Sequence, residues 1–166
     1  MELRRLSTPP RIKVLEALGA IADGRVVEEG GGRFRVTSSD GSRRYSVYVE
    51  PRGQGRFIAC STDNGTVFRG YVGYPIISVL MVLGYLPRDE VVERALSGIP
   101  WRKLNESLKR YYLVEREVLR VASSRGATSS RLEQLVSRVL SALERYELLY
   151  DPSTCGAVHG EVEGTD

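Results

Sequence analysis

Arginines gather around one predicted β-hairpin, and they are the residues of this sequence best suited to bind a ligand. Arg33 and Arg35 alternate along the stretch RFRVTSS, so their side chains share one face of the predicted strand. The next predicted strand, RRYSVYVE, follows an Asp-Gly pair at 40–41 that is typical of a tight hairpin turn. Because neighbouring strands bring such residues together, we expect one basic patch. Its members are Arg33, Arg35, Arg43, Arg44, Tyr48, Arg52 and Arg56.

A basic patch of this kind is typical of a surface that binds nucleic acid. Guanidinium groups form paired hydrogen bonds with phosphate, and a tyrosine among them offers a ring on which a base can stack. Residues 1–56 carry 11 Arg and Lys against 7 Asp and Glu, while the rest carries 13 against 14, so the positive charge lies in the N-terminal part. We expect DNA or RNA as the partner. The alternative to nucleic-acid binding is that these residues form an ordinary solvated face of a thermostable-looking sheet. This alternative also covers contact with a protein partner.

Residue types that could catalyse a reaction are not brought together by the sequence. Cys60 lies near a predicted turn, but a cysteine nucleophile needs a base, and the one histidine, His159, lies in a polar tail. Cys155 and His159 are four positions apart, and two such donors are too few for a structural metal site. Glu115 and Glu117 flank an arginine on a predicted helix and are expected to be solvated. We therefore predict a protein that is not an enzyme and that holds no metal and no cofactor.

The patch is positioned by a predicted α+β fold. Apolar residues at threefold spacing predict an amphipathic helix over 9–22. Between 25 and 71, alternating stretches bounded by glycine-containing turns predict a small antiparallel β-meander, whose last strand is TVFRGY. A proline-led apolar run then predicts a buried helix over 75–85, so helices flank the meander.

The stretch from 33 to 85 resembles a SWIM-type zinc finger. RRYSVYVEPRGQGRFIACSTDNG is similar to the hairpin and strand of that family, and VGYPIISVLMVLG is similar to the start of its helix. The resemblance places the four ligand positions on Ala59, Ser61, Gly73 and Pro75, or the first two on Cys60 and Thr62. Structural zinc needs four nitrogen or sulfur donors. The resemblance therefore implies a degenerate, metal-free finger in a small archaeal-type protein, with a DNA-binding or protein-interaction role.

Two helices are predicted to form a C-terminal hairpin. One runs over 101–123, and the other runs without a break over 130–150. Apolar residues on the second helix follow steps of four and three, a short heptad seam that packs within the chain or forms a homodimer. The seam residues are Leu132, Val136, Val139, Leu143 and Tyr146. An alternative function is therefore protein interaction or oligomerisation through these helices, without a nucleic-acid role.

These patterns divide the chain into an α+β SWIM-like module over 1–87, a helical arm over 88–150 and a disordered tail over 151–166. The two cysteines are not expected to pair, because Cys155 lies in that tail. The longest apolar run, IISVLMVL at 76–83, is far too short to span a bilayer, and the N-terminus has no apolar leader segment. We expect a protein of the cytoplasm with no membrane partner.

Overall fold

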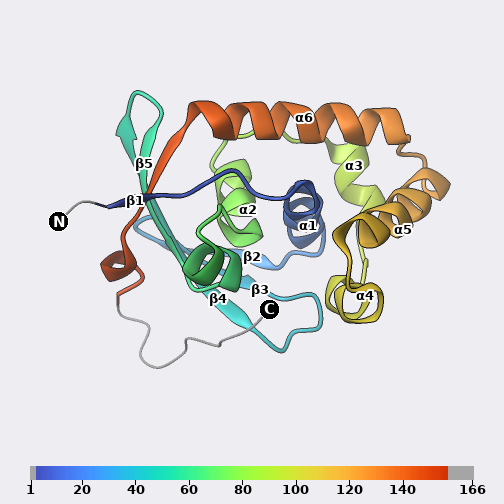
Figure 1. Ribbon diagram of the computed structural model, residues 1–166, viewed down its shortest axis with the longest axis horizontal. Coiled ribbons are helices and arrows are strands. Elements are labelled where there is room, and N and C mark those ends of the chain that lie inside the picture. Colours follow the sequence, from blue (N-terminus) through green and yellow to red (C-terminus); the bar gives the residue numbers. More distant parts are fainter. Residues whose placement is uncertain (1–2, 157–166) are drawn as a thin grey trace.

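The computed structural model of the protein describes residues 3–156, which form a sheet with helices packed against it (Figure 1). The strands of the described chain are β1 (Arg4–Arg5), β2 (Val26–Gly30), β3 (Arg33–Thr37), β4 (Arg44–Gly53), β5 (Arg56–Ser61) and β6 (Glu147–Tyr150). Its α-helices are α1 (Arg11–Ala22), α2 (Tyr74–Val82), α3 (Glu90–Ala95), α4 (Trp101–Leu108), α5 (Tyr111–Ser124) and α6 (Ser129–Arg145). A π-helix, η1 (Gly65–Arg69), and a 3-10 helix, η2 (Pro152–Thr154), are also formed.

The described strands lie in the order β1-β6-β5-β4-β3-β2. Strands β2 to β5 are consecutive antiparallel neighbours, which confirms the predicted meander and the α+β class. β6 lies parallel to β5 and antiparallel to β1. The C-terminal strand is therefore inserted between two strands from the first half of the chain.

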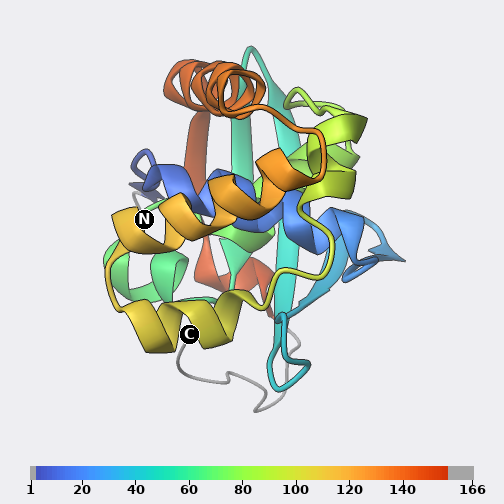
Figure 2. The same cartoon turned by 90° about the vertical axis from the view of Figure 1, so that its right-hand side faces the viewer.

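One face of the sheet carries the apolar residues of the alternating strands and is covered by helices. Phe34, Val36 and Val47 are buried on this face. α2 packs on β4 and β5, and α1 contacts both α2 and α6, as Figures 1 and 2 show. A single hydrophobic cluster contains residues of the meander and of each of these α-helices. Residues on both sides of position 87 therefore contribute to one core.

The predicted helix over 101–123 is divided into two helices. α4 ends at Leu108, and Lys109 adopts a left-handed backbone with a φ of 63°. α5 starts at Tyr111 and lies above α4 in the view of Figure 2. A left-handed φ is uncommon for a residue with a side chain. The break was not predicted because the stretch NESLKRYY contains no glycine or proline.

The last predicted helix is shorter than expected and is followed by a strand. α6 stops at Arg145, and residues 147–150 form β6, in which Leu148 lies in register with Phe57 of β5. The prediction of a continuous helix to residue 150 was wrong. Heptad spacing describes a local pattern, whereas the backbone of ELLY gains hydrogen-bonding partners from β5 and β1, and Leu148 becomes buried in the core.

The predicted last strand of the meander, TVFRGY, is also different in the structure. Most of it forms η1, which is followed by Gly70 with a left-handed φ of 73°. A side chain at Gly65 would collide with the ring of Tyr71, so the glycine permits a tight loop folded onto that ring. The prediction of a strand over 66–71 was wrong. The residues of TVFRGY are of types that form strands, but the turn before them does not return the chain to the sheet.

Cys60 and Cys155 form a disulfide bond, with their Cα atoms 5.5 Å apart. The prediction that they remain unpaired was wrong, because β6 runs parallel to β5 and η2, which follows β6, brings Cys155 to Cys60. The start of the predicted tail is therefore held against the sheet. Residues 157–166, which include His159, lie outside the described residues.

Candidate nucleic-acid interface

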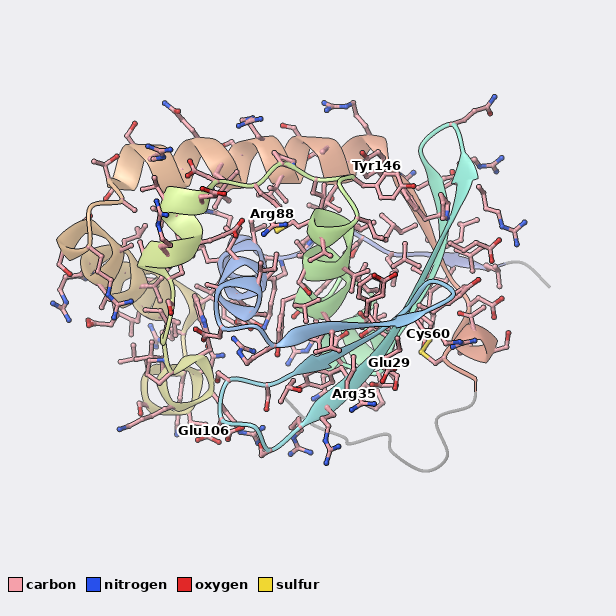
Figure 3. All side chains as sticks on the ribbon, turned by 180° about the vertical axis from the view of Figure 1, so that it is seen from behind. Glu29, Arg35, Cys60, Arg88, Glu106 and Tyr146 are labelled. Carbon is pink, nitrogen blue, oxygen red and sulfur yellow. A yellow bond between two sulfur atoms is a disulfide. The ribbon has the colours of Figure 1, made fainter. Side chains whose placement is uncertain are left out.

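The predicted hairpin exists, and it carries its polar side chains on the face of the sheet that α1 and α2 do not cover. We call this the outer face and define it by Arg33, Arg35, Arg44 and Tyr48. These residues alternate along β3 and β4 with the buried residues of the core. Figure 3 shows Arg35 projecting from the side of the sheet opposite to α2. The sequence prediction of a shared strand face is therefore correct for this group.

Arg33 and Tyr48 form the centre of the outer face. They are partners in the β3–β4 register, and the guanidinium carbon of Arg33 lies 5.0 Å from the centre of the Tyr48 ring. Arg33 Nη1 also donates a 2.7 Å hydrogen bond to the carbonyl oxygen of Thr154. This bond joins the outer face to the segment that the disulfide holds in place.

Tyr48 is fixed from its other end by a carboxylate. Its hydroxyl donates a hydrogen bond to Glu50 Oε1 at 2.6 Å. This hydrogen bond is the largest cause that raises the pKa of Tyr48 above its ordinary value. The phenol therefore stays neutral at physiological pH, and its ring is oriented by contacts at both ends.

Three of the predicted arginines are paired with exposed or half-exposed carboxylates. Arg35 pairs with Glu29, which lies at the irregularity of the β2–β3 ladder and was not predicted. The other pairs are Arg52 with Glu50 at 2.6 Å and Arg56 with Glu147 at 3.4 Å. Such exposed ion pairs contribute at most about 1 kcal/mol. A phosphate can therefore compete with the carboxylates for these guanidinium groups.

Six of the seven predicted residues form a stripe along β4 and not one compact patch. Arg44 lies in register with Thr37 at one end of β4, and Arg52 and Arg56 lie at the opposite end, around the β4–β5 turn. Eight residue steps separate Arg44 from Arg52, which is roughly 27 Å in an extended strand. Arg43 precedes β4, is half-buried, and has its Nε enclosed, so it does not belong to the outer face.

The predicted interaction seam on α6 is used inside the chain. Leu132, Val136, Val139 and Leu143 are buried in the hydrophobic core. Tyr146 is half-buried and donates a 2.6 Å hydrogen bond to the carbonyl oxygen of Tyr85 (Figure 3). The seam therefore has its partners within the chain, which is one of the two arrangements that the heptad pattern left open.

The positions at which the SWIM resemblance places zinc ligands lie around a buried polar cluster. Ser61 Oγ donates to Asp63 Oδ1 at 2.5 Å, and Thr66 Oγ1 donates to the same oxygen at 2.9 Å. A side chain at Gly73 would collide with the Asp63 carboxylate. Ala59 and Pro75 are buried. The resemblance itself stays a prediction.

A second cluster, on the other side of the molecule's sheet, was missed by the sequence analysis. Lys13 and Glu16 lie on α1 and form a 3.2 Å ion pair, although both side chains are largely buried. Trp101 of α4 lies close by, with 3% of its surface exposed. The available signal was the Lys and Glu three positions apart within an otherwise apolar helix. Among residues 3–156, no group of three or more His, Cys, Asp or Glu residues could hold a metal ion.

None of the helices in the described range is long and apolar enough to cross a membrane.

Comparison with protein-family models assigns the chain to a family. Residues 6–149 match the family described as Uncharacterised conserved protein UCP014422, so the chain belongs to that family. No curated protein and no solved structure matches the chain.

Proposed function

We propose that this chain is a non-enzymatic protein that binds single-stranded nucleic acid on the outer face of its sheet. The observation that supports this most directly is the Arg33–Tyr48 pair, with its guanidinium carbon 5.0 Å from the ring centre. An aromatic ring stacks on any base, and a guanidinium group binds phosphate through paired hydrogen bonds. The pair thus combines the two kinds of contact that single strands need.

The neighbouring arginines extend this centre in the direction of β4. Arg35 lies two residues from Arg33 on β3, and Arg44 lies four residues from Tyr48 on β4. Arg52 and Arg56 continue the stripe at the turn between β4 and β5. An extended strand of nucleic acid can lie along such a stripe and exchange the exposed carboxylate partners of these arginines for phosphates.

The shape of the surface favours a single strand over a duplex. Sequence-specific contact with B-form DNA uses a helix or a two-stranded ribbon that enters the major groove. The outer face is instead a sheet surface, bordered by the segment 152–155, with the side chain of Tyr48 between arginines, which is the arrangement of a stacking platform. We therefore propose that single-stranded RNA or DNA binds more tightly than the corresponding duplex.

The alternative function, protein interaction through the C-terminal helices, has less support. Its predicted contact residues on α6 are buried in the core of the same chain. A partner could reach them only after α6 is displaced, which would expose the apolar side of the helix.

Amide chemical shifts of the isotope-labelled protein, titrated with a ten-nucleotide RNA, would test the proposed surface. We expect the largest shifts in β3 and β4, around Arg33 and Tyr48. The protein with Arg33 and Arg35 both changed to Ala should not show these chemical-shift changes. The double variant Arg116→Ala, Arg120→Ala removes two exposed arginines from α5, and it should still show the chemical-shift changes in β3 and β4. Shifts confined to other elements, or no shifts at millimolar RNA, would refute the proposal.

A further inference from the structure

A cavity of about 250 Å³ lies between α1, α4 and the turn that joins β3 to β4. Its wall includes Lys13, Glu16, Arg25, Tyr74, Trp101 and Arg102. Binding sites for drug-sized molecules are commonly 300–1,000 Å³, so this cavity suits a smaller molecule. The cavity lies on the helix-covered side of the sheet and shares none of these residues with the outer face.

The cavity is rich in positive charge that is partly buried. Lys13, Arg25 and Arg102 line it, and their side chains are 14%, 12% and 24% exposed. The carboxylates in its wall are Glu16 and Glu106, and from beside the cavity Asp23 pairs with Arg25 at 3.8 Å and Asp40 pairs with Arg102 at 3.3 Å. Charges in such a site interact more strongly than charges in water, because the surrounding dielectric constant is low. An anion that enters the cavity would compete with these carboxylates for the guanidinium groups of Arg25 and Arg102.

Lys13 retains its charge in spite of its burial. Burial lowers the pKa of Lys13, but the negative charge of Glu16, with contributions from Tyr71 and Tyr111, raises it above its ordinary value. Lys13 Nζ also lies 5.4 Å from the centre of the Tyr111 ring. The ammonium group is therefore a fixed positive charge at one wall of the cavity.

Two donors in the residues around the cavity have no acceptor. Arg25 Nη2 and Trp101 Nε1 are buried and make no hydrogen bond with the described part of the chain. Arg25 uses only its Nη1 in a hydrogen bond, to the carbonyl oxygen of Thr37 at 2.6 Å. Leaving a buried donor unpaired is costly, more so when the donor is charged. A ligand that brings an acceptor oxygen to Arg25 would reduce this cost, whereas the indole nitrogen of Trp101 lies against Gly19 of α1.

Aromatic rings supply the rest of the wall. Tyr74 from α2, Trp101 from α4 and Tyr111 from α5 all line the cavity. Trp101 lies against the backbone of α1, where a Cβ at Gly19 would be 2.6 Å from the indole nitrogen. Flat rings from three helices favour a ligand that itself has a flat, unsaturated ring.

We propose that this cavity binds a small organic anion, one that joins a phosphate or carboxylate group to a flat ring. The anionic group would contact Arg25 and Arg102, and the ring would pack against Trp101 and Tyr74. This site is distinct from the outer face and does not depend on the nucleic-acid function.

Calorimetric titration of the full-length chain would test the ligand class. The probes are AMP and benzoate as ring-bearing anions, adenosine as the neutral ring, and inorganic phosphate as the anion without a ring. We expect AMP or benzoate to bind at least tenfold more tightly than both adenosine and phosphate, and the stronger of the two identifies the anionic group. If neither binds with a Kd below about 1 mM, or if adenosine or inorganic phosphate binds as tightly, the proposal fails.

Variants would then assign the binding to this cavity. Arg102→Gln removes one cation from a half-exposed position. We expect this variant to bind the tighter-binding probe with an affinity at least tenfold lower. Trp101→Phe keeps a ring but removes the indole donor, and a smaller loss is expected. The matched control is Arg88→Gln: Arg88, labelled in Figure 3, pairs with Glu93 at 2.9 Å and does not line the cavity. Equal affinity of Arg102→Gln and the unchanged protein would overturn the assignment, while circular dichroism and thermal unfolding of the variants would show that they are folded.

Discussion

Arg33 and Tyr48 face each other across the β3–β4 ladder, and the guanidinium group of one lies over the ring of the other at 5.0 Å. The pair is held from both sides. Thr154 accepts a hydrogen bond from Arg33, and Glu50 accepts one from Tyr48. An arginine and an aromatic ring that are already oriented lose less conformational freedom when a ligand binds, which favours affinity.

Tyr48 should contribute to binding through its ring and not through its hydroxyl. Stacking of one base on an aromatic side chain is worth about 1–3 kcal/mol, so Tyr48→Ala should weaken binding of single-stranded RNA by about 5- to 150-fold. Tyr48→Phe keeps the ring and should change the affinity little. Fluorescence anisotropy with a labelled RNA measures both. Tyr112→Ala, which removes an exposed tyrosine from α5, is the control, and an equal loss in this variant would argue against a specific role of Tyr48.

The disulfide should contribute a large part of the thermal stability. It joins residues 95 positions apart, and closing a loop of this length stabilises a fold by about 4.7 kcal/mol in the chain-entropy account. For a chain of this size, this corresponds to a decrease in Tm of roughly 10 °C when the bond is absent. Calorimetry with and without a reductant measures the difference.

Cys155→Ala provides the control for the disulfide. This variant should unfold at the temperature of the reduced protein and should not respond to reductant. Cys155 is buried but is not part of the hydrophobic core cluster, so the substitution leaves the packing of that cluster intact. If the unchanged protein has the same Tm in oxidising and reducing buffer, the disulfide does not stabilise it.

Asp89 connects two helices and should make them sensitive to acid. Its Oδ1 accepts hydrogen bonds from the backbone N–H groups of Val91 and Val92 at the start of α3, and its carboxylate pairs with Arg131 of α6 at 2.6 Å. Removing a cap of this kind costs about 1–2 kcal/mol, which is the expected loss in the free energy of unfolding for Asp89→Ala. Asp89→Asn retains an acceptor for the cap and should cost less. Urea unfolding at pH 7 compares the two variants.

The contribution of Asp89 should disappear in acid. The hydrogen bond from Arg131 is the largest cause that lowers its pKa below the ordinary value of 3.8. A carboxyl group with a lowered pKa stabilises the fold above its unfolded-state pKa, and this stability is lost as the pH falls through the folded-state pKa. The difference between the unchanged protein and Asp89→Asn should therefore narrow below pH 3.8. A constant difference across this range would contradict the ion pair.

Gly73 should be required by the buried polar cluster around Asp63. A methyl group at this position would collide with the Asp63 carboxylate, so Gly73→Ala should lower the free energy of unfolding by about 1–3 kcal/mol. In the Asp63→Ala background the collision is absent, and the cost of Gly73→Ala should fall. Chemical unfolding of the four proteins in this double-mutant cycle measures the coupling. Additive costs would show that the two residues do not interact.

The part of the fold that follows local patterns was predictable from the sequence. Strict alternation along β3 and β4 indicated which residues share a face, and the proline-led apolar run indicated α2. β6 was not predictable, because the residues of ELLY become a strand only through backbone hydrogen bonds to segments 90 or more positions away. The disulfide depends on the same placement, so it could not be predicted either.

The candidate site was predictable in its centre and not in its extent. Alternation placed Arg33 and Arg35 on one face, but the distance of Arg52 from Arg44 depends on the length of β4, which the proline at 51 concealed. The pairing of Arg35 with Glu29 depends on an irregularity in the β2–β3 ladder. The cavity beside α1 joins segments from the whole chain, and no local pattern in the sequence indicates it.

The dependence of RNA affinity on salt is the most direct test of the outer face. Each phosphate contact on a single strand adds about 0.7 to the slope of log K against log salt concentration. The variant with Arg33 and Arg35 changed to Ala should therefore have a slope lower by about 1.4 than that of the unchanged protein, while Arg116→Ala, Arg120→Ala should retain it. Equal slopes for the unchanged protein and the Arg33, Arg35 variant would contradict the proposed function.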